Sequence, residues 1–242
     1  MHIKTRGIVL QIVNYSETSV IARILTEKLG LITYMVNGVR SSKAIAKAAM
    51  MRPLSLLDLE VTQRENKNMQ RIKEFRRAYN YQTIPFDVVK SGIALFLLEV
   101  ISKTVKENDV NESLFEFVYE QLLLLDEEPR AVPYFHMQFL LHYAHYLGFG
   151  PHDNYSESTP CFDLQEGVFV EERFTSAVVL PRLISQAVHL LCNTSPVSRM
   201  ELPLPKLQRR ELLSGLLRYY QLHVEGFGHL KSHEVLETVF GN

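Results

Sequence analysis

The sequence has little cysteine and no long hydrophobic run. Only two of its 242 residues are cysteines, Cys161 and Cys192, so we expect no disulfide framework, and a four-thiolate zinc site within the chain is excluded. The longest apolar runs are Ile93–Leu98 and Leu122–Leu125, whereas a membrane-spanning helix needs roughly 18 residues. The N-terminus lacks the apolar stretch of a secretory signal. We therefore expect no membrane partner and a reducing, cytoplasmic setting.

The motifs of common enzyme classes are also missing. There is no G-x-x-x-x-G-K-[ST] phosphate loop, no G-x-G-x-x-G after a strand and no G-x-S-x-G elbow. His142 and His145 lack the carboxylate of an H-E-x-x-H zinc site, and Cys161 has no local base. Asp58 and Glu60 share a strand face, as in a metal-dependent nuclease, but ordinary alternation explains them as well. We expect no catalytic residues and no bound metal.

Charge is distributed unevenly along the chain. The net charge is −1, but residues 1–80 carry 14 Lys and Arg against 6 Asp and Glu, a net charge of +8, and residues 81–242 carry −9. Such a positive surplus predicts a polyanionic partner, of which nucleic acid is the usual one. Two other interpretations stay open: the basic residues only keep a small domain soluble, or the basic part docks onto the acidic part.

The first 80 residues follow a strand pattern. Alternation predicts that Ile8, Leu10 and Ile12 share one face of the first strand, with Gly7 at a bend or bulge. The fifth segment of the pattern also fits a helix. The predicted strands are Ile3–Val13, Ser19–Thr26, Leu31–Val39, Leu57–Thr62 and Met69–Tyr79, and a short helix is predicted at Ser41–Met51.

Three strands, a short helix and two strands are the order of an OB-fold, a small barrel that often holds oligonucleotides across one face. An SH3-like barrel is the main alternative, but it usually lacks the helix. We therefore predict an α+β protein, in which residues 1–80 form an OB-fold barrel.

Residues 81–242 follow a helical pattern, which predicts an α-helical domain. Pro85 fits the first turn of its first helix. The stretch 148–174 is polar and irregular, and it contains a possible small hairpin at Phe162–Val170. Further helices are predicted at Ser113–Leu125, Tyr134–Leu147, Ser176–Leu191, Lys206–Leu222 and Ser232–Phe240.

Basic residues gather around the predicted short helix and along the fifth strand. Five aromatic residues are interleaved with them and could stack on bases, although Tyr34 and Phe75 could equally belong to the barrel core. The basic residues are Arg40, Lys43, Lys47 and Arg52, and then Arg64, Lys67, Arg71, Lys73, Arg76 and Arg77. The aromatic residues are Tyr15, Tyr34, Phe75, Tyr79 and Tyr81.

Segments along nearly the whole chain resemble the RecO family of bacterial recombination mediators, in the order in which that family has them. No one segment is specific, but the ordered set is. The segments are Thr5–Leu10, Tyr15–Ser19, Thr26–Leu31, Gly38–Lys43, Arg52–Ser55, Phe96–Val100, Leu147–Phe149, Phe162–Gly167, Tyr219–His223 and Lys231–Leu236.

The resemblance implies an OB-fold joined to a helical domain and a role without catalysis in the bacterial cytoplasm, associated with the nucleoid. Members bind single- and double-stranded DNA, anneal complementary strands, and load RecA together with RecR and the C-terminal tail of single-stranded DNA-binding protein. Arg6, Arg40, Lys43 and Arg52 match the family's basic region. From charge alone we add Lys47, Arg71, Lys73 and Arg76 to the predicted DNA-binding set.

The chain departs from the family in one place. Many members carry a four-cysteine zinc module after the Gly-Phe segment, but the matching stretch Gly150–Arg173 has only Cys161, so we predict that zinc is absent. Packing of Phe162, Leu164, Val168 and Phe169 would then hold the hairpin. An acidic, apolar tail needs a hydrophobic groove beside a cation, and the candidates are Arg182, Arg199, Arg209 and Arg210.

The leading hypothesis is strand annealing through neutralised phosphates. A second hypothesis is a protein-interaction scaffold, in which the helical domain holds repair partners and DNA binding is weak or incidental. A metal-dependent nuclease is the third, and it rests only on Asp58, Glu60 and the histidines.

Overall fold

A computed structural model describes residues 2–39, 45–62, 69–128, 133–172, 178–194, 202, 204–232 and 236. Its elements form two compact units, one made of Met1–Phe86 and Leu98–Asp126 and the other of Asp87–Leu97 and Glu127–Asn242. The boundary that the sequence suggests near residue 80 stays a prediction. The strands are β1 (His2–Asn14), β2 (Val20–Thr26), β3 (Gly30–Val36), β4 (Leu56–Thr62), β5 (Gln70–Arg77), β6 (Cys161–Asp163) and β7 (Val168–Val170). The helices are α1 (Ile45–Met50), α2 (Val88–Thr104), α3 (Glu112–Glu127), α4 (Phe135–Tyr146), α5 (Arg182–Cys192) and α6 (Lys206–His223).

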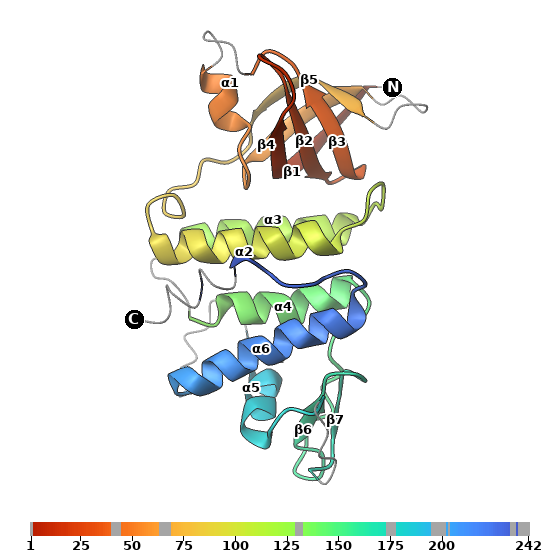
Figure 1. The fold of residues 1–242 in the computed structure, drawn as a ribbon, viewed down its shortest axis with the longest axis vertical. Coiled ribbons are helices and arrows are strands. Elements are labelled where there is room, and N and C mark those ends of the chain that lie inside the picture. The colour runs from red at the N-terminus through yellow and green to blue at the C-terminus, as the bar shows by residue number, and fades with distance from the viewer. Residues whose placement is uncertain are drawn as a thin grey trace. The chain divides into compact units, whose positions relative to one another are not determined.

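The first unit contains a closed five-stranded barrel in the strand order β1-β2-β3-β5-β4, with α1 between β3 and β4 along the chain (Figure 1). All neighbouring strands are antiparallel except β3 and β5, which pair in parallel. The predicted OB-like barrel is therefore confirmed. The fifth segment is a strand and not a helix, because residues 70–77 find a full antiparallel partner in β4.

The residues of β1 that face the barrel interior differ from those that the alternation predicts. The pairing of β1 with β2 shifts register between Val9 and Gln11, so the bulge lies at Leu10 and not at Gly7. Because of this shift, Val9 packs in the barrel core and Ile12 packs against it, and the prediction that Ile8, Leu10 and Ile12 share one face is wrong. Gly7 serves a different purpose, since a Cβ there would lie 2.7 Å from Leu59 Cδ1.

β2 and β4 follow the alternation of a strand with one buried face. Both strands place every second side chain in the core of the barrel, where α1 and its flanks add two more residues. The members from β2 and β4 are Val20, Ala22, Ile24, Leu57, Leu59 and Val61, and Val39 and Met51 lie on either side of α1. The predicted start of the short helix at Ser41 lies outside the described residues.

A buried carboxylate ties the segment after the barrel to the end of α3. Asp126 Oδ1 accepts the backbone N–H groups of Thr83 at 2.8 Å and Ile84 at 2.9 Å. Its other oxygen accepts the N–H of Gln82 at 2.8 Å and the hydroxyl of Tyr79 at 3.0 Å. Burial raises the pKa of this carboxyl, but the donated hydrogen bonds outweigh burial and hold the pKa below its usual range.

The second unit contains α4, α5, α6 and the two-stranded sheet β6–β7, which lies beside α5 (Figure 1). This sheet is the hairpin predicted in the 148–174 stretch. Phe162 and Phe169 face each other across it, both almost fully buried, with ring centroids 5.1 Å apart. The backbone N–H of Phe162 donates to Ser185 Oγ of α5 at 2.8 Å. Aromatic packing and α5 therefore hold the hairpin.

Two predicted helix starts are wrong. The helix after Pro85 begins at Val88, because Asp87 Oδ1 accepts the N–H groups of Val89 and Lys90 and so caps the first turn there. The helix expected from Ser176 begins at Arg182, after Pro181. Most of the predicted helix at Ser232–Phe240 lies outside the described residues. Among the described helices, none is long and apolar enough to cross a membrane.

Candidate nucleic-acid interface

A hollow of about 460 Å³ opens over β1, β4 and β5 of the barrel. It is not a cationic cleft, because its charged lining residues are three cations and four carboxylates. The cations are Lys4, Arg6 and Arg76, and the carboxylates are Glu27, Asp58, Glu60 and Glu74. Mixed charge of this kind does not concentrate a polyanion.

Arg6 is held by side chains of its own unit. Its guanidinium makes ion pairs with Glu27, at 3.1 Å, and with Glu116 of α3. It also lies over the rings of Phe115 and Tyr119, 5.4 Å and 5.0 Å from their centroids. The hydrogen bond to Glu27 is the main cause that raises the pKa of Arg6, and the same bond lowers the pKa of Glu27. Local sequence pattern does not predict this clamp, because Glu116 is 110 residues away from Arg6 in the sequence.

Two further cations of the predicted DNA-binding set are paired across β4 and β5. Arg76 Nε lies 3.0 Å from Asp58 Oδ2, and Lys73 Nζ lies 2.5 Å from Glu60 Oε1. The hydrogen bond from Lys73 to Glu60 lowers the pKa of Glu60, and the same bond raises the pKa of Lys73. Asp58 and Glu60, the carboxylates considered for a nuclease, are thus engaged as ion-pair partners.

Three cations of the set remain exposed without an ion pair. They are Lys47 on α1, Arg52 just after it and Arg71 at the start of β5, and none of them has an ionic partner among the residues that the structure describes. Arg40 and Lys43 lie outside the described residues. Of the six predicted positions that the structure describes, these three offer a full positive charge to a ligand.

The five candidate stacking residues fall into different environments. Tyr34 is completely buried in the barrel core, and Phe75 packs against the same core. Tyr81 donates its hydroxyl to Leu54 O at 3.0 Å, and Tyr79 is bound to Asp126. Tyr15 is the remaining one, with 60% of its surface exposed at the turn between β1 and β2.

One register row crosses the outer surface of four barrel strands, β1, β2, β3 and β5. Val13 pairs with Ile21, Ile21 with Met35, and Met35 with Arg71. Their neighbours Ile12, Val20, Tyr34 and Ile72 pack in or against the core, so these four side chains point outward. The row was not predicted from the sequence. Each of its residues is nevertheless next to a residue that packs in or against the core, so alternation alone would place all four side chains on the outer face.

The second unit offers a small groove between α4 and α6. Its walls are Pro133, His136, Met137 and Leu213, with Lys206, Arg209 and Arg210 at its edge. Of the four candidate tail-binding arginines, the structure therefore brings Arg209 and Arg210 to one apolar groove. Arg182 is engaged elsewhere, in ion pairs with Glu157 at 2.7 Å and Glu172 at 3.6 Å, and Arg199 lies outside the described residues.

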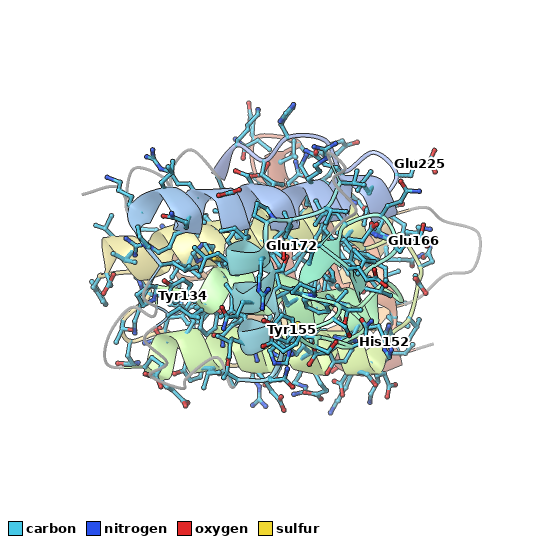
Figure 2. The ribbon with its side chains drawn as sticks, turned by 90° about the horizontal axis from the view of Figure 1, so that it is seen from below. Tyr134, His152, Tyr155, Glu166, Glu172 and Glu225 are labelled. Carbon is cyan, nitrogen blue, oxygen red and sulfur yellow. The ribbon has the colours of Figure 1, made fainter. Side chains whose placement is uncertain are left out.

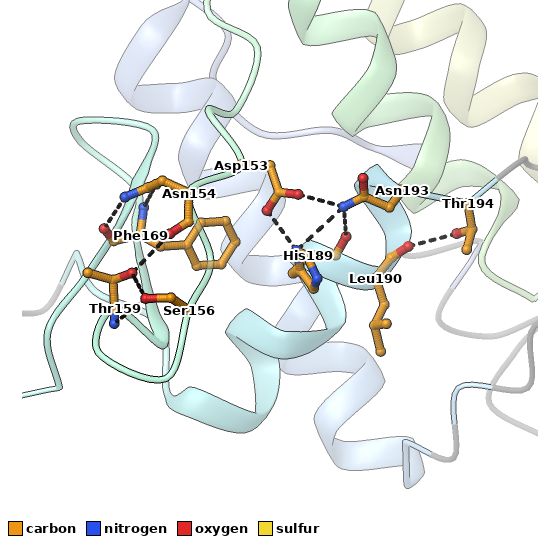
Figure 3. Close-up of polar contacts among 9 residues, drawn as sticks. All are labelled: Asp153, Asn154, Ser156, Thr159, Phe169, His189, Leu190, Asn193 and Thr194. Atoms are coloured by element: carbon orange, nitrogen blue, oxygen red, sulfur yellow. Dashed lines mark hydrogen bonds and ion pairs between the residues drawn. The ribbon is translucent and has the colours of Figure 1, made fainter.

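The region before β6 is fastened to α5 by a polar cluster (Figure 3). His189 Nδ1 lies 2.7 Å from Asp153 Oδ1, and Asn193 donates to Asp153 Oδ2 at 2.6 Å. The ring of Tyr155 stacks on His189 with centroids 4.5 Å apart, and Tyr155 and Glu172 both lie over α5 in Figure 2. In the described part of the chain, no group of three or more His, Cys, Asp or Glu is placed to hold a metal ion.

Comparison with known proteins identifies relatives along almost the whole chain. The family model for the N-terminal part of recombination protein O matches residues 1–81, and the model for its C-terminal part matches residues 85–234. Proteins named DNA repair protein RecO are similar throughout. The protein from Phocaeicola vulgatus is 33% identical over 98% of each chain. The protein from Flavobacterium psychrophilum is 32% identical over 99% of this chain and all of its own.

Proposed function

Because the chain belongs to the RecO family of DNA repair proteins, we propose that it acts as a recombination mediator without catalysis. It binds single- and double-stranded DNA without sequence specificity and anneals complementary strands. With RecR and single-stranded DNA-binding protein, it helps to load RecA. DNA is bound by the barrel within residues 1–80, and partner proteins are held by the helical domain within residues 81–242.

The observation that carries this proposal is the set of unpaired cations on the barrel unit. Lys47, Arg52 and Arg71 are exposed and have no ionic partner among the described residues. Each can therefore neutralise a backbone phosphate and release a condensed counterion, which is the main source of affinity in binding without sequence preference. Phosphate contacts alone carry no sequence information, so every DNA sequence is bound alike.

Annealing follows from the same electrostatics. Two complementary strands repel each other through their phosphates, and a protein that neutralises part of that charge lowers the cost of bringing them together. Arg6, Lys73 and Arg76 contribute less to this neutralisation, since their charge is already balanced by carboxylates.

The groove of the second unit supports the proposed binding of a partner's tail. An acidic peptide with an apolar end can place that end against Met137 and Leu213 and its carboxylates against Arg209 and Arg210. The absence of catalysis and of zinc stays a prediction.

One observation favours the scaffold hypothesis as a second candidate. Three of the six described cations in the predicted set are already paired with carboxylates of the first unit, so fewer of them are available to DNA than the sequence indicates. In this alternative, the groove between α4 and α6 carries the function and DNA binding is incidental.

The test is fluorescence anisotropy with labelled single-stranded DNA, titrated across salt. The variant Lys47→Gln, Arg52→Gln, Arg71→Gln removes the three unpaired charges. We expect it to weaken binding of all sequences alike and to reduce the slope of log affinity against log salt by about 2, since each phosphate contributes about 0.7.

A matched control removes the same charge from other exposed positions, as Lys28→Gln, Lys106→Gln, Arg218→Gln. The control should bind nearly as the unmodified protein does. Equal loss in both variants would mean that only net charge matters. Absence of any DNA binding at low salt would favour the scaffold hypothesis.

A further inference from the structure

We infer that Tyr15 is a base-stacking residue that gives the barrel a preference for single-stranded over double-stranded DNA. The inference rests on the proposed function and adds a determinant that is independent of charge. Among the five candidate aromatic residues of the first unit, Tyr15 is the one with an exposed ring.

Tyr15 stands on a turn that its own backbone holds in place. Its N–H donates to Ser19 O at 3.1 Å, and the N–H of Ser16 donates to the same oxygen at 3.2 Å. The turn is joined to the segment after β3, because Ser19 Oγ donates to Asn37 Oδ1 at 3.1 Å. An exposed ring on a fixed turn loses little conformational entropy when it contacts a ligand.

The neighbouring surface suits a nucleic-acid strand. The row Val13, Ile21, Met35 and Arg71 begins two residues before Tyr15 on β1 and crosses to β5. With strands spaced about 4.8 Å apart, Val13 and Arg71 are about 14 Å apart. Three apolar side chains, of which Val13 is half exposed, thus lie between an exposed aromatic ring and an unpaired cation.

An exposed ring, apolar side chains and a cation on one surface discriminate between single- and double-stranded DNA. Apolar side chains and a tyrosine ring offer contacts to base faces, and Arg71 offers a contact to a phosphate. In a duplex, the faces of the bases are covered by their neighbours in the stack, so only the phosphate contact remains. Single-stranded DNA has free base faces and can use both contacts. Tyr15 therefore affects the binding of single strands, whereas the cations affect both forms.

The first test compares Tyr15→Ala with the unmodified protein on single- and double-stranded DNA of equal length. We expect affinity for single strands to fall about 5- to 150-fold, the range for loss of one stacked base. Affinity for duplex and the salt dependence should change less than twofold. Phe86→Ala serves as the control, because Phe86 is 83% exposed in the same unit and lies outside the proposed surface. It should leave both affinities unchanged.

A second readout uses the absence of tryptophan from the chain. Tyr15→Trp introduces a single tryptophan, whose fluorescence should be quenched by stacking on a base when single-stranded DNA is added, whereas the single tryptophan of Phe86→Trp should not respond. Quenching together with the selective loss supports the inference. Normal single-strand binding by Tyr15→Ala, or equal loss for both forms, overturns it while the proposed function stands. Failure of the unmodified protein to bind either form overturns both.

Discussion

Arg76 and Asp58 face each other directly in the register of β5 and β4, with Nε 3.0 Å from Oδ2. Both side chains are exposed enough to meet water, so their ion pair contributes little to the stability of the barrel. Its larger effect is electrostatic, because Asp58 balances the positive charge of Arg76, a residue that the sequence predicts to bind DNA.

Replacing Asp58 by Asn should release that charge. We expect Asp58→Asn to raise affinity for single-stranded DNA about two- to fivefold at low salt and to steepen the salt dependence, because Arg76 becomes available to a phosphate. The free energy of unfolding should change by less than about 1 kcal/mol. Anisotropy titrations and denaturant unfolding measure the two effects. Glu120→Gln, which removes an exposed carboxylate on α3, is the matched control, and an equal gain in that variant would contradict the prediction.

Asp126 should make the stability of the first unit depend on pH. Its pKa in the folded protein lies below the unfolded value of about 3.8, so its contribution is fully present above pH 4 to 5 and is lost as the pH falls through the lower folded pKa. At pH 7 we expect Asp126→Asn to destabilise the protein by about 2–4 kcal/mol, because an amide cannot accept all four hydrogen bonds.

Denaturant unfolding from pH 7 down to pH 3 tests the role of Asp126. The difference in unfolding free energy between the unmodified protein and Asp126→Asn should shrink as the pH falls. A difference that stays constant over this range would show that the variant acts through packing and not through the charge of the carboxylate. Glu127→Gln, the next residue on α3, is a control with an exposed side chain and should leave the pH dependence unchanged.

Local pattern was sufficient to predict the barrel, because alternation and turn residues act over a few positions. Val20, Ala22 and Ile24 alternate along β2 and lie together in the core for this reason. The face of β1 was not, since the bulge at Leu10 shifts the alternation by one residue and depends on pairing with β2. The start of α2 also differs from the predicted one. Both Pro85 and Asp87 fit the beginning of a helix, and the hydrogen bonds that Asp87 accepts from the first turn decide that the helix begins after Asp87.

The candidate interface was harder to predict than the fold. A sequence shows how many cations a segment has, but whether each is paired depends on contacts between distant residues. Arg76 meets a carboxylate 18 positions away, and Arg6 meets one that is 110 positions away. The exposure of Tyr15 among five aromatic residues is likewise a property of the folded barrel.

The hairpin of the second unit should be independent of metal. Phe162 and Phe169 are buried against each other, and Cys161 is the only cysteine between residues 148 and 174. We expect a chelator such as EDTA to leave the thermal midpoint unchanged within about 1 °C, since the packing of the hairpin predicts that no structural metal supplies folding energy. Phe162→Ala should cost about 3–5 kcal/mol. Exposed Phe86 gives the control, Phe86→Ala, with a cost below about 0.5 kcal/mol. A clear drop in the midpoint on chelation would contradict this account.

The groove between α4 and α6 should bind an acidic peptide with an apolar C-terminal end. Arg209 lies at its edge, so reversing that charge places a carboxylate against the carboxylates of the peptide, and we expect Arg209→Glu to weaken binding at least tenfold. Arg182→Glu makes the same change in net charge at an arginine that is already paired with Glu157, and it should have less than a threefold effect. Anisotropy of a labelled peptide gives both values, and a peptide with its apolar end replaced by Ser tests the groove itself. Equal weakening by Arg209→Glu and Arg182→Glu would show that the acidic peptide responds only to the net charge of the protein. The prediction that it binds in this groove would then be wrong.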